Sequence, residues 1–136
     1  VTFYVKFPEA IRHDHTFFKF TNDAGDGIEL KTSNDGGSYS YSAWTNLKIE
    51  QIGNSTGVTF STIITPNSWK RISLKIVSTS IEEVYIDGIK VSTDGDPNLP
   101  NISSPPHGDI IFGGVGFSSS DSILFDHIFV YDERHQ

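Results

Sequence analysis

Hydrophobic and polar residues alternate along most of this chain, in short runs separated by clusters of Gly, Asn, Asp and Ser. In the first run, 1–7, Val1, Phe3 and Val5 alternate with Thr, Tyr and Lys. A period of two is typical of a strand that buries one face, and no window keeps a helical apolar period before Gly, Pro, Ser or Asn interrupts it. The sequence therefore predicts an all-β protein, with strands at 1–7, 16–20, 27–33, 39–44, 47–52, 58–64, 68–77, 109–117 and 122–133 and a hairpin at 84–92.

The expected architecture is an antiparallel two-sheet sandwich. About ten or eleven short strands without a helix bury their apolar faces most simply against one another. The 136 residues are enough for one buried core and too few for two, so we expect a single domain that spans residues 1–136.

Two of the expected strands carry patterns that bear on the core. In 68–77, Trp69, Ile72, Leu74 and Ile76 indicate a long strand whose alternation is clean from Ile72 onward. The last strand is apolar on both faces, with Leu124, Ile128 and Val130 on one face and Phe125, Phe129 and Tyr131 on the other.

The stretch 84–92 is predicted to form a β-hairpin, because β-branched residues alternate with polar ones on both sides of Asp87 and Gly88. Asp-Gly between such runs is the strongest short hairpin signal, and Gly88 suits the positive φ of a type I′ turn. An alternative places Asp87 and Glu83 on one strand face, where two carboxylates could act as acid and base in a glycosidase. The position of Asp87 inside the turn disfavours this alternative.

Composition excludes several classes of partner. The net charge of −7 and the pI near 5.0 disfavour nucleic acid, because binding to phosphate backbones needs clustered Lys and Arg. No apolar run is long enough to cross a bilayer, so we expect no membrane insertion. The absence of Cys excludes disulfides, thiolate metal sites and cysteine nucleophiles. The chain also has no Met and begins at Val1, so we expect a processed chain or a segment excised from a larger protein.

One block of the chain, NSWKRISLKIVSTSIEEVYIDGIKVS (67–92), has a Trp that opens a strand and a second strand that ends in Tyr-Ile-Asp-Gly. Together with FYVKF (3–7), GIELKTSNDGG (27–37) and DIIFGGVGFSSSDSILFDHIFVYDE (109–133), it resembles in order and spacing the laminin G-like domains of the concanavalin A-like lectin and glucanase superfamily. The resemblance implies a jelly-roll sandwich of two antiparallel sheets. It also implies that Trp69, which opens its strand, belongs to the core.

Catalysis is not expected. The enzymes of that superfamily carry three acidic residues on one strand face in an E-x-D-x-x-E pattern, and this chain has no match to it. EEVYID (82–87) has the wrong spacing, and DHIFVYDE (126–133) lacks the leading Glu. No local Ser-His-Asp arrangement is present, and GGVG (113–116) opens no helix, so it is no phosphate loop.

Histidines offer a weak case for a transition metal. His13 and His15 could hold zinc or copper if their stretch were a strand, because alternate residues face the same way. The stretch lies between expected strands, so we predict a solvated loop instead. His127 lies in the last expected strand, where a packed or a surface histidine is the expected role.

Calcium is a candidate cofactor. DGDPN (94–98) sets Asp94, Asp96 and Asn98 at alternate positions, as at the beginning of a calcium-binding loop. The Gly and the closing Glu of that pattern are missing. The resemblance supports the site, since related domains often bind calcium at a loop rim. Asp23 and Asp26 in NDAGD form a second, weaker candidate.

A cluster of aromatic and polar residues in SYSYSAWTN (38–46) is the best binding candidate. Tyr39 and Tyr41 alternate, so in a strand they share one face, and Trp44 and Asn46 follow. Flat rings beside hydroxyls and amides suit a sugar, which needs stacking and orienting hydrogen bonds. The alternative is that Tyr39 and Tyr41 are ordinary strand residues that pack across a sheet.

These features predict a non-catalytic recognition module, glycan-binding or adhesive, whose partner is a glycan or a glycoprotein receptor. Glycosylation acceptors at Asn54 and Asn101 lie in expected loops and agree with a secreted or cell-surface location. The alternative is a structural or protein-binding domain without carbohydrate affinity, including a domain of a toxin or a viral attachment protein. Both alternatives remain open, because one fold hosts many functions.

Overall fold

The structure is a computed structural model that describes residues 1–37, 39–54, 57–77, 80–93, 96, 99–100, 109–113 and 122–131. These residues contain twelve strands and no helix, as the alternation predicts, and hence no helix suited to crossing a membrane. The strands are β1 (Thr2–Lys6), β2 (Ile11–Arg12), β3 (Thr16–Thr21), β4 (Gly27–Ser33), β5 (Tyr41–Ser42), β6 (Thr45–Gln51), β7 (Gly57–Ile64), β8 (Trp69–Val77), β9 (Ser80–Ile86), β10 (Ile89–Lys90), β11 (Ile110–Phe112) and β12 (Leu124–Phe129).

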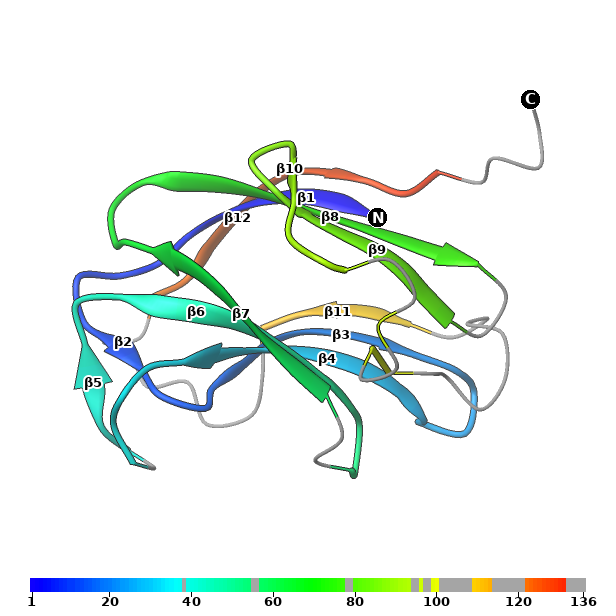
Figure 1. Cartoon of the computed structure of the whole chain (residues 1–136), viewed down its shortest axis with the longest axis horizontal. Helices are drawn as coiled ribbons and strands as arrows, with labels where there is room; N and C mark the ends of the chain where they lie inside the picture. Colours follow the sequence, from blue (N-terminus) through cyan, green and yellow to red (C-terminus); the bar gives the residue numbers. More distant parts are fainter. Residues whose placement is uncertain are drawn as a thin grey trace.

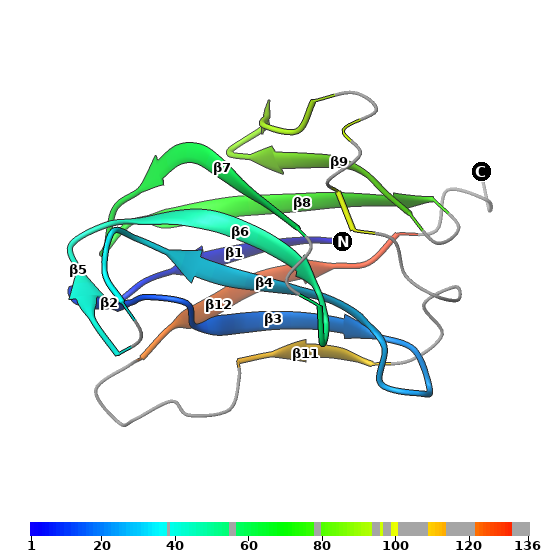
Figure 2. The ribbon, with the colours of Figure 1, turned by 60° about the horizontal axis from the view of Figure 1, so that its bottom comes forward.

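Ten of the strands form two antiparallel sheets, which stack as the two layers of a sandwich (Figure 1). The β1 sheet has the order β10-β9-β8-β1-β12, and the β4 sheet has the order β11-β3-β4-β6-β7. The short strands β2 and β5 pair with each other at one end of the sandwich (Figure 2). The predicted all-β sandwich with two antiparallel sheets is therefore confirmed.

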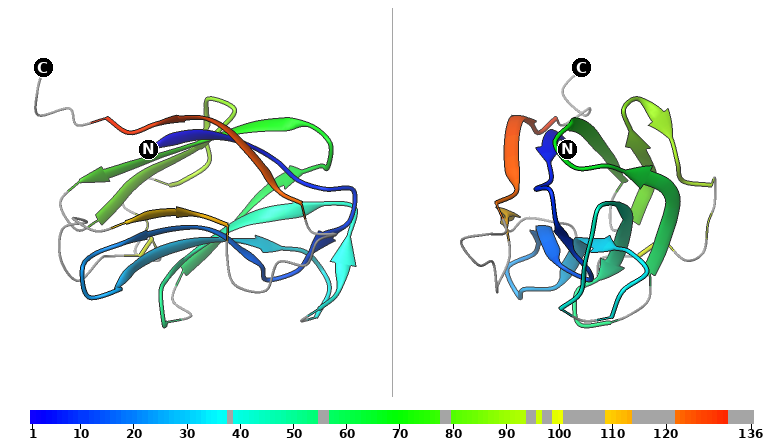
Figure 3. Two further views of the ribbon diagram at one scale, coloured as in Figure 1. Left: turned by 180° about the vertical axis from the view of Figure 1, so that it is seen from behind. Right: turned by 90° about the vertical axis from the view of Figure 1, so that its left-hand side faces the viewer.

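The first and the last described strands lie side by side. β12 pairs antiparallel with β1, whose other edge pairs with β8 (Figure 3). Three strands from distant parts of the sequence thus form one continuous surface on the outer face of the β1 sheet.

Apolar side chains from both sheets fill the space between them, and phenylalanines gather at the edge formed by β1 and β12 in one sheet and β3 and β11 in the other. Phe3 stacks on Phe18 with ring centroids 5.0 Å apart, and Phe112 meets Phe125 edge to face, also at 5.0 Å. These four rings come from four strands and both sheets, so their packing ties the layers together. The buried apolar residues are Phe3, Val5, Phe7, Ile11, Phe17, Phe18, Ile28, Leu30, Leu47, Ile49, Phe60, Ile64, Ile72, Leu74, Ile81, Val84, Ile86 and Leu99.

Trp69 does not belong to this core, so its predicted position is wrong. The side chain is 42% exposed and lies on the outer face of the β1 sheet, where Trp69 pairs with Lys6. The alternation of side chains along β8 explains this position. Ile72 and Leu74 are buried, and Trp69 lies an odd number of residues before them, so alternation sends it to the opposite face.

β12 also departs from the predicted alternation, because a bulge interrupts it at His127. Its backbone has φ 48°, and the pairing with β1 changes from Tyr4 opposite Asp126 to Thr2 opposite Phe129. Three residues of β12 therefore oppose two of β1, which leaves one extra residue in β12. The bulge reverses the faces after it, so the prediction that Phe125 and Phe129 share one face is wrong: Phe125 packs against the core, and Phe129 lies outside.

The predicted hairpin joins β9 to β10. Asp87 and Gly88 have φ of 53° and 80°, both positive as a type I′ turn requires. The Asp87 carboxylate accepts hydrogen bonds from the Arg71 backbone N–H at 2.9 Å and from Lys70 Nζ at 3.2 Å. Asp87 thus fixes the turn to β8 as well as forming it.

Glu83 has partners of its own, so it forms no acid–base pair with Asp87. The Tyr85 hydroxyl donates to Glu83 Oε2 at 2.8 Å, and Lys90 Nζ lies 3.7 Å from Glu83 Oε1. The hydrogen bond to Glu83 raises the pKa of Tyr85. The two carboxylates therefore serve different contacts.

Candidate functional site

The outer face of the β1 sheet carries an open groove beside β12. Its volume is about 360 Å³, and it is lined by Tyr4 from β1, Trp69 from β8, and Asp126 and His127 from β12. We call it the aromatic groove. It unites side chains that are far apart in the sequence.

The register of three strands brings these side chains together. Tyr4 pairs with Asp126 on one side, and Lys6, two residues farther along β1, pairs with Trp69 on the other. The neighbours of Tyr4 in β1 are fully buried, so alternation directs Tyr4 outward. The sequence does not predict the groove, because Trp69 was expected in the core and no local pattern shows which strands pair.

The bulge in β12 turns His127 toward the groove. The Asp126 carboxylate accepts the backbone N–H of His127 at 2.8 Å and lies 3.2 Å from its Nδ1. This contact holds the left-handed backbone of His127 in place. The imidazole then meets the Tyr4 ring edge to face, with centroids 5.7 Å apart.

Groups of both charges border the groove. Lys6 Nζ lies 5.5 Å from the centre of the Trp69 ring, a cation–π contact that orients the indole. The Asp126 side chain is mostly exposed to solvent, so its carboxylate can accept further hydrogen bonds. The groove thus offers flat apolar surface together with a hydrogen-bond acceptor and donors, the combination that orients a small polar ligand.

The predicted cluster at 38–46 has a different backbone from the one expected. Tyr39 has φ 73°, and only Tyr41 and Ser42 form a strand, so the prediction of a strand at 39–44 is wrong beyond β5. The two tyrosine rings are 76% and 50% exposed, and the Arg12 guanidinium lies 4.8 Å from the centre of the Tyr39 ring. Because alternation is lost at Tyr39, a shared strand face no longer follows for Tyr39 and Tyr41.

Of the other two residues of the predicted cluster, Trp44 immediately precedes β6 and Asn46 lies within it. Trp44 is half-buried, and the Asn46 amide donates to the Thr62 carbonyl on β7 at 3.2 Å. The amide therefore already bridges two strands of the β4 sheet. Glycan binding by Tyr39, Tyr41, Trp44 and Asn46 stays a prediction, on a part of the molecule separate from the aromatic groove.

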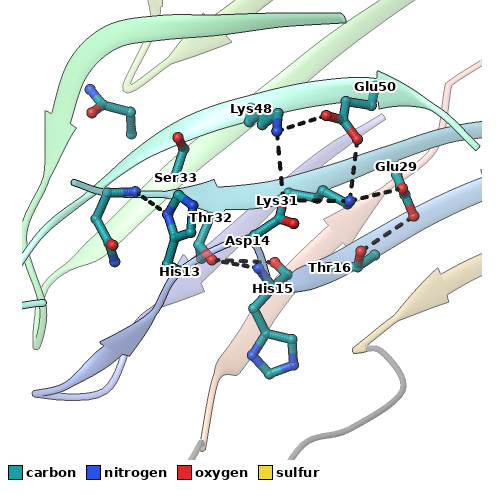
Figure 4. A network of polar contacts seen from close by, with 12 residues as sticks. His13, Asp14, His15, Thr16, Glu29, Lys31, Thr32, Ser33, Lys48 and Glu50 are labelled. Carbon is teal, nitrogen blue, oxygen red and sulfur yellow. Dashed lines mark hydrogen bonds and ion pairs between the residues drawn. The ribbon is translucent and has the colours of Figure 1, made fainter. Parts of the chain in front are cut away.

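The two histidines of RHDH do not form a solvated loop. His15 is buried at 6% exposure, and its N–H donates to the Thr32 hydroxyl at 2.9 Å. His13 is half-buried, and its Nδ1 accepts the Asn34 N–H at 2.9 Å. Asp14 between them is in a left-handed turn, so the two rings point in different directions (Figure 4).

That turn delivers Asp14 to an ion-pair network on the outer face of the β4 sheet (Figure 4). Lys31 Nζ lies 3.5 Å from Asp14 Oδ1, 3.5 Å from Glu29 Oε1 and 3.2 Å from Glu50 Oε2. Lys48 Nζ lies 2.8 Å from Glu50 Oε1 and 3.6 Å from Asp14 Oδ1. This network was not predicted, although Glu-x-Lys at 29–31 and Lys-x-Glu at 48–50 in neighbouring strands were a usable signal.

Opposing effects act on Lys31. Burial of its ammonium group lowers the pKa, but the hydrogen bond to Glu50 and the charges of Glu29, Asp14 and Glu50 outweigh burial, so the pKa of Lys31 is raised above 10.5. Each carboxylate of the network already contacts a lysine. The geometry is that of a structural ion-pair network rather than of a site open to a ligand.

The described structure gives little support to the candidate calcium ligands. Asp94 and Asn98 lie outside the described residues, and Asp96 is half-buried. Asp23 and Asp26 are exposed in the turn between β3 and β4. Within the described ranges, no three His, Asp or Glu side chains are grouped as a metal ion would need.

Comparison with known proteins adds no identification: no protein-family model, no curated protein and no solved structure matches this chain. A function must therefore be inferred from the residues and geometry of the chain itself.

Proposed function

We propose that this chain is a non-catalytic recognition module that binds a carbohydrate in the aromatic groove. The observation that carries the proposal is an exposed indole, Trp69, in one hollow with the Tyr4 ring and the Asp126 carboxylate. Aromatic rings stack on the apolar face of a sugar, and a carboxylate accepts charge-assisted hydrogen bonds from its hydroxyls.

The groove is built on rigid elements, which favours binding without rearrangement. Tyr4 stands between residues of β1 that are fully buried, and the cation–π contact with Lys6 orients Trp69. A site whose side chains are already ordered loses less conformational entropy when a ligand binds. A sugar could therefore stack on Trp69 at little cost in side-chain order.

The finer topology of the fold and the location of the protein are also proposals. We infer a jelly-roll domain of the laminin G-like type in a secreted or cell-surface protein, on the resemblance of four stretches of the sequence. The two five-stranded antiparallel sheets support the fold. Asn54, a glycosylation acceptor in form, is exposed in the turn between β6 and β7, which is compatible with an extracellular location; Asn101 lies outside the described residues.

The two tryptophans of the chain give a matched test, because one stands at each candidate site: Trp69 in the aromatic groove and Trp44 in the cluster at 38–46. The native protein is first screened on a glycan array, and affinity for the strongest hits is then measured by calorimetry. We expect Trp69→Ala to weaken binding about tenfold to a hundredfold, or about 1.4 to 2.8 kcal/mol, and Trp44→Ala to leave it unchanged.

Thermal unfolding of both variants serves as the control. Trp69 is partly exposed, so Trp69→Ala should cost less stability than the ~3–5 kcal/mol of a buried aromatic truncation such as Phe3→Ala. Loss of binding in Trp44→Ala alone would move the site to the predicted cluster. An array without any glycan bound by the native protein would refute the proposal.

A second candidate function, binding to another protein, is favoured by one observation. β12 is an edge strand of the β1 sheet, and Leu124, Ile128 and Phe129 of β12 are exposed together with Val130 just after it. An exposed apolar edge strand is a surface to which a strand of a partner can add. Ile128→Lys should abolish such an interaction in pull-down experiments from extracellular fluid, whereas Trp69→Ala should leave it intact.

A further inference from the structure

We propose that the carbohydrate is an extended chain of several sugars, which runs diagonally across the β1 sheet from Trp69 over Tyr4 to Phe129 and Tyr131. This inference rests on the proposed function of the aromatic groove and names the class of its ligand. We call these four residues, in this order, the aromatic track.

The strand register places the track. Along β1, the row of Lys6 and Trp69 is followed by the row of Tyr4 and then by the row of Thr2 and Phe129. Four residues separate the first row from the last, which corresponds to about 13 Å at about 3.3 Å per residue. Because the rings step from β8 to β1 to β12, the track crosses the strands diagonally.

The far end of the track is a pair of parallel rings. Phe129 and Tyr131 have centroids 6.1 Å apart and planes within 4° of each other, and both are exposed. Phe129 shares the outer face with Thr2, opposite which it lies. These rings therefore extend the flat apolar surface beyond the groove on the same side of the sheet.

The bulge in β12 is what creates this continuity. With regular alternation, Phe129 would share a face with Phe125, which packs against the core. The extra residue at His127 reverses the faces and brings Phe129 and Tyr131 to the same side as Tyr4. A local irregularity thus aligns the rings of Phe129 and Tyr131, which follow the bulge, with the groove.

Polar groups accompany the rings, as a glycan requires. The Thr2 hydroxyl donates to the Ser73 hydroxyl at 3.0 Å, and this pair shares its row with Phe129. Asp126 stands in the row of Tyr4. Alternating rings and hydrogen-bonding groups match a sugar chain, which has both apolar faces and hydroxyls. An added peptide strand would instead follow the edge of β12 with its backbone.

Dependence of affinity on chain length tests the inference. The probes are cello-oligosaccharides, chito-oligosaccharides and hyaluronan oligosaccharides of two, four and six sugars, measured by calorimetry against the native protein. Within a series that binds, we expect the hexasaccharide to bind about tenfold or more tightly than the disaccharide. The double variant Phe129→Ala/Tyr131→Ala should lose this gain and keep its affinity for the disaccharide within about twofold. Trp69→Ala should weaken binding at every length.

Ile89→Ala is the control, because Ile89 is an exposed apolar residue of the same sheet away from the track, and it should bind like the native protein. Thermal unfolding confirms that each variant is folded. Equal affinity for all lengths of a bound series would overturn the extended track and leave the groove in place. Absence of binding in all three series, despite a glycan bound on the array, would also overturn it, whereas absence of any bound glycan would remove the proposed function as well. Length-dependent binding that the double variant retains would place the chain on another path.

Discussion

At the scale of single residues, left-handed backbone conformations decide where the chain changes direction. Among the described non-Gly residues, Asp14, Tyr39, Asn67, Asp87 and His127 have positive φ. Asp, Asn and His are the side chains that tolerate this conformation best, and four of the five belong to these types. Tyr39 is the exception, and its backbone is strained in the middle of the cluster that the sequence predicts to bind a sugar.

The turn at Asp87 and Gly88 gives the sharpest prediction at this scale. Gly88→Val should destabilise the domain by about 1–3 kcal/mol, because a β-branched side chain is strained at φ 80°. Asp87→Asn should cost about 1 kcal/mol or less, since Asn keeps an oxygen for the Arg71 N–H and loses only an exposed ion pair with Lys70. Urea denaturation measures both. A loss larger in Asp87→Asn than in Gly88→Val would contradict this assignment.

At the scale of strands, the register between β4 and β6 explains why Asp14 contacts two lysines. The register of β4 and β6 sets Lys31 opposite Lys48 and Glu29 opposite Glu50, and like charges directly opposite each other destabilise a sheet. The diagonal contact from Lys31 to Glu50 relieves part of the repulsion. Asp14 lies within 3.6 Å of both lysines and relieves the repulsion between them, so a residue outside the sheet stabilises the pairing of two strands.

Asp14→Asn isolates this charge effect, because Asn also tolerates the left-handed turn. We expect a loss of about 0.5–1 kcal/mol at low salt, since two facing lysines lose their shared partner. The loss should shrink at about 1 M salt, where the Debye length falls to about 3 Å. Urea denaturation at both salt concentrations gives the comparison. A loss that does not depend on salt would indicate that Asp14 acts through its backbone turn instead.

The raised pKa of Lys31 predicts how this network depends on pH. Its pKa in the folded protein lies above 10.5, so folding favours the protonated ammonium. The stabilisation is fully present below pH 10.5 and is lost as the pH rises through the folded value. The stability difference between the native protein and Lys31→Met should therefore be constant from neutral pH to about pH 9 and decrease above pH 10.5. Lys75→Met, at the exposed pair with Glu82, is the matched control in urea titrations across this range. A difference that grows at alkaline pH would contradict the sign.

The alternation of apolar and polar residues predicted most strands well. It failed at the bulge in β12 and at the beginning of β8. It placed the strand at 27–33, where Ile28, Leu30 and Thr32 are all buried, and the strand at 58–64, where Phe60 and Ile64 are buried. It placed the last strand at 122–133 but assigned the faces of β12 wrongly after His127, since the bulge there depends on pairing with β1 rather than on local pattern. The exposed position of Trp69 could in principle be predicted, because Trp69 lies three residues before Ile72 and alternation places the two on opposite faces. The aromatic groove could not, because no local signal in the sequence shows that β1 pairs with both β8 and β12.

The two outer faces of the sandwich differ in chemistry at the scale of the whole molecule. The β4 sheet covers its outer face with ion pairs among Asp14, Lys31 and Glu50, so its charges are largely satisfied within the protein. The β1 sheet carries ion pairs too, between Lys75 and Glu82 and between Lys90 and Glu83, but near β12 it also presents exposed rings. Since β1 and β12 meet only when the described chain is folded from end to end, binding in the aromatic groove should require the complete fold.

At the scale of the whole domain, calcium binding would raise the free energy of unfolding. A ligand that binds only the folded state raises the free energy of unfolding by mass action, about 2.7 kcal/mol at a concentration one hundred times its Kd. The stretch 94–98 lacks the Gly and the closing Glu of a calcium loop. We therefore expect the melting temperature to be the same in millimolar calcium and in EDTA. Asp96→Asn provides the control, because it removes the charge of the one described candidate ligand in this stretch. A rise of several degrees with calcium that EDTA reverses and Asp96→Asn abolishes would instead establish a site at 94–98, and the glycan measurements would then have to be made with calcium present.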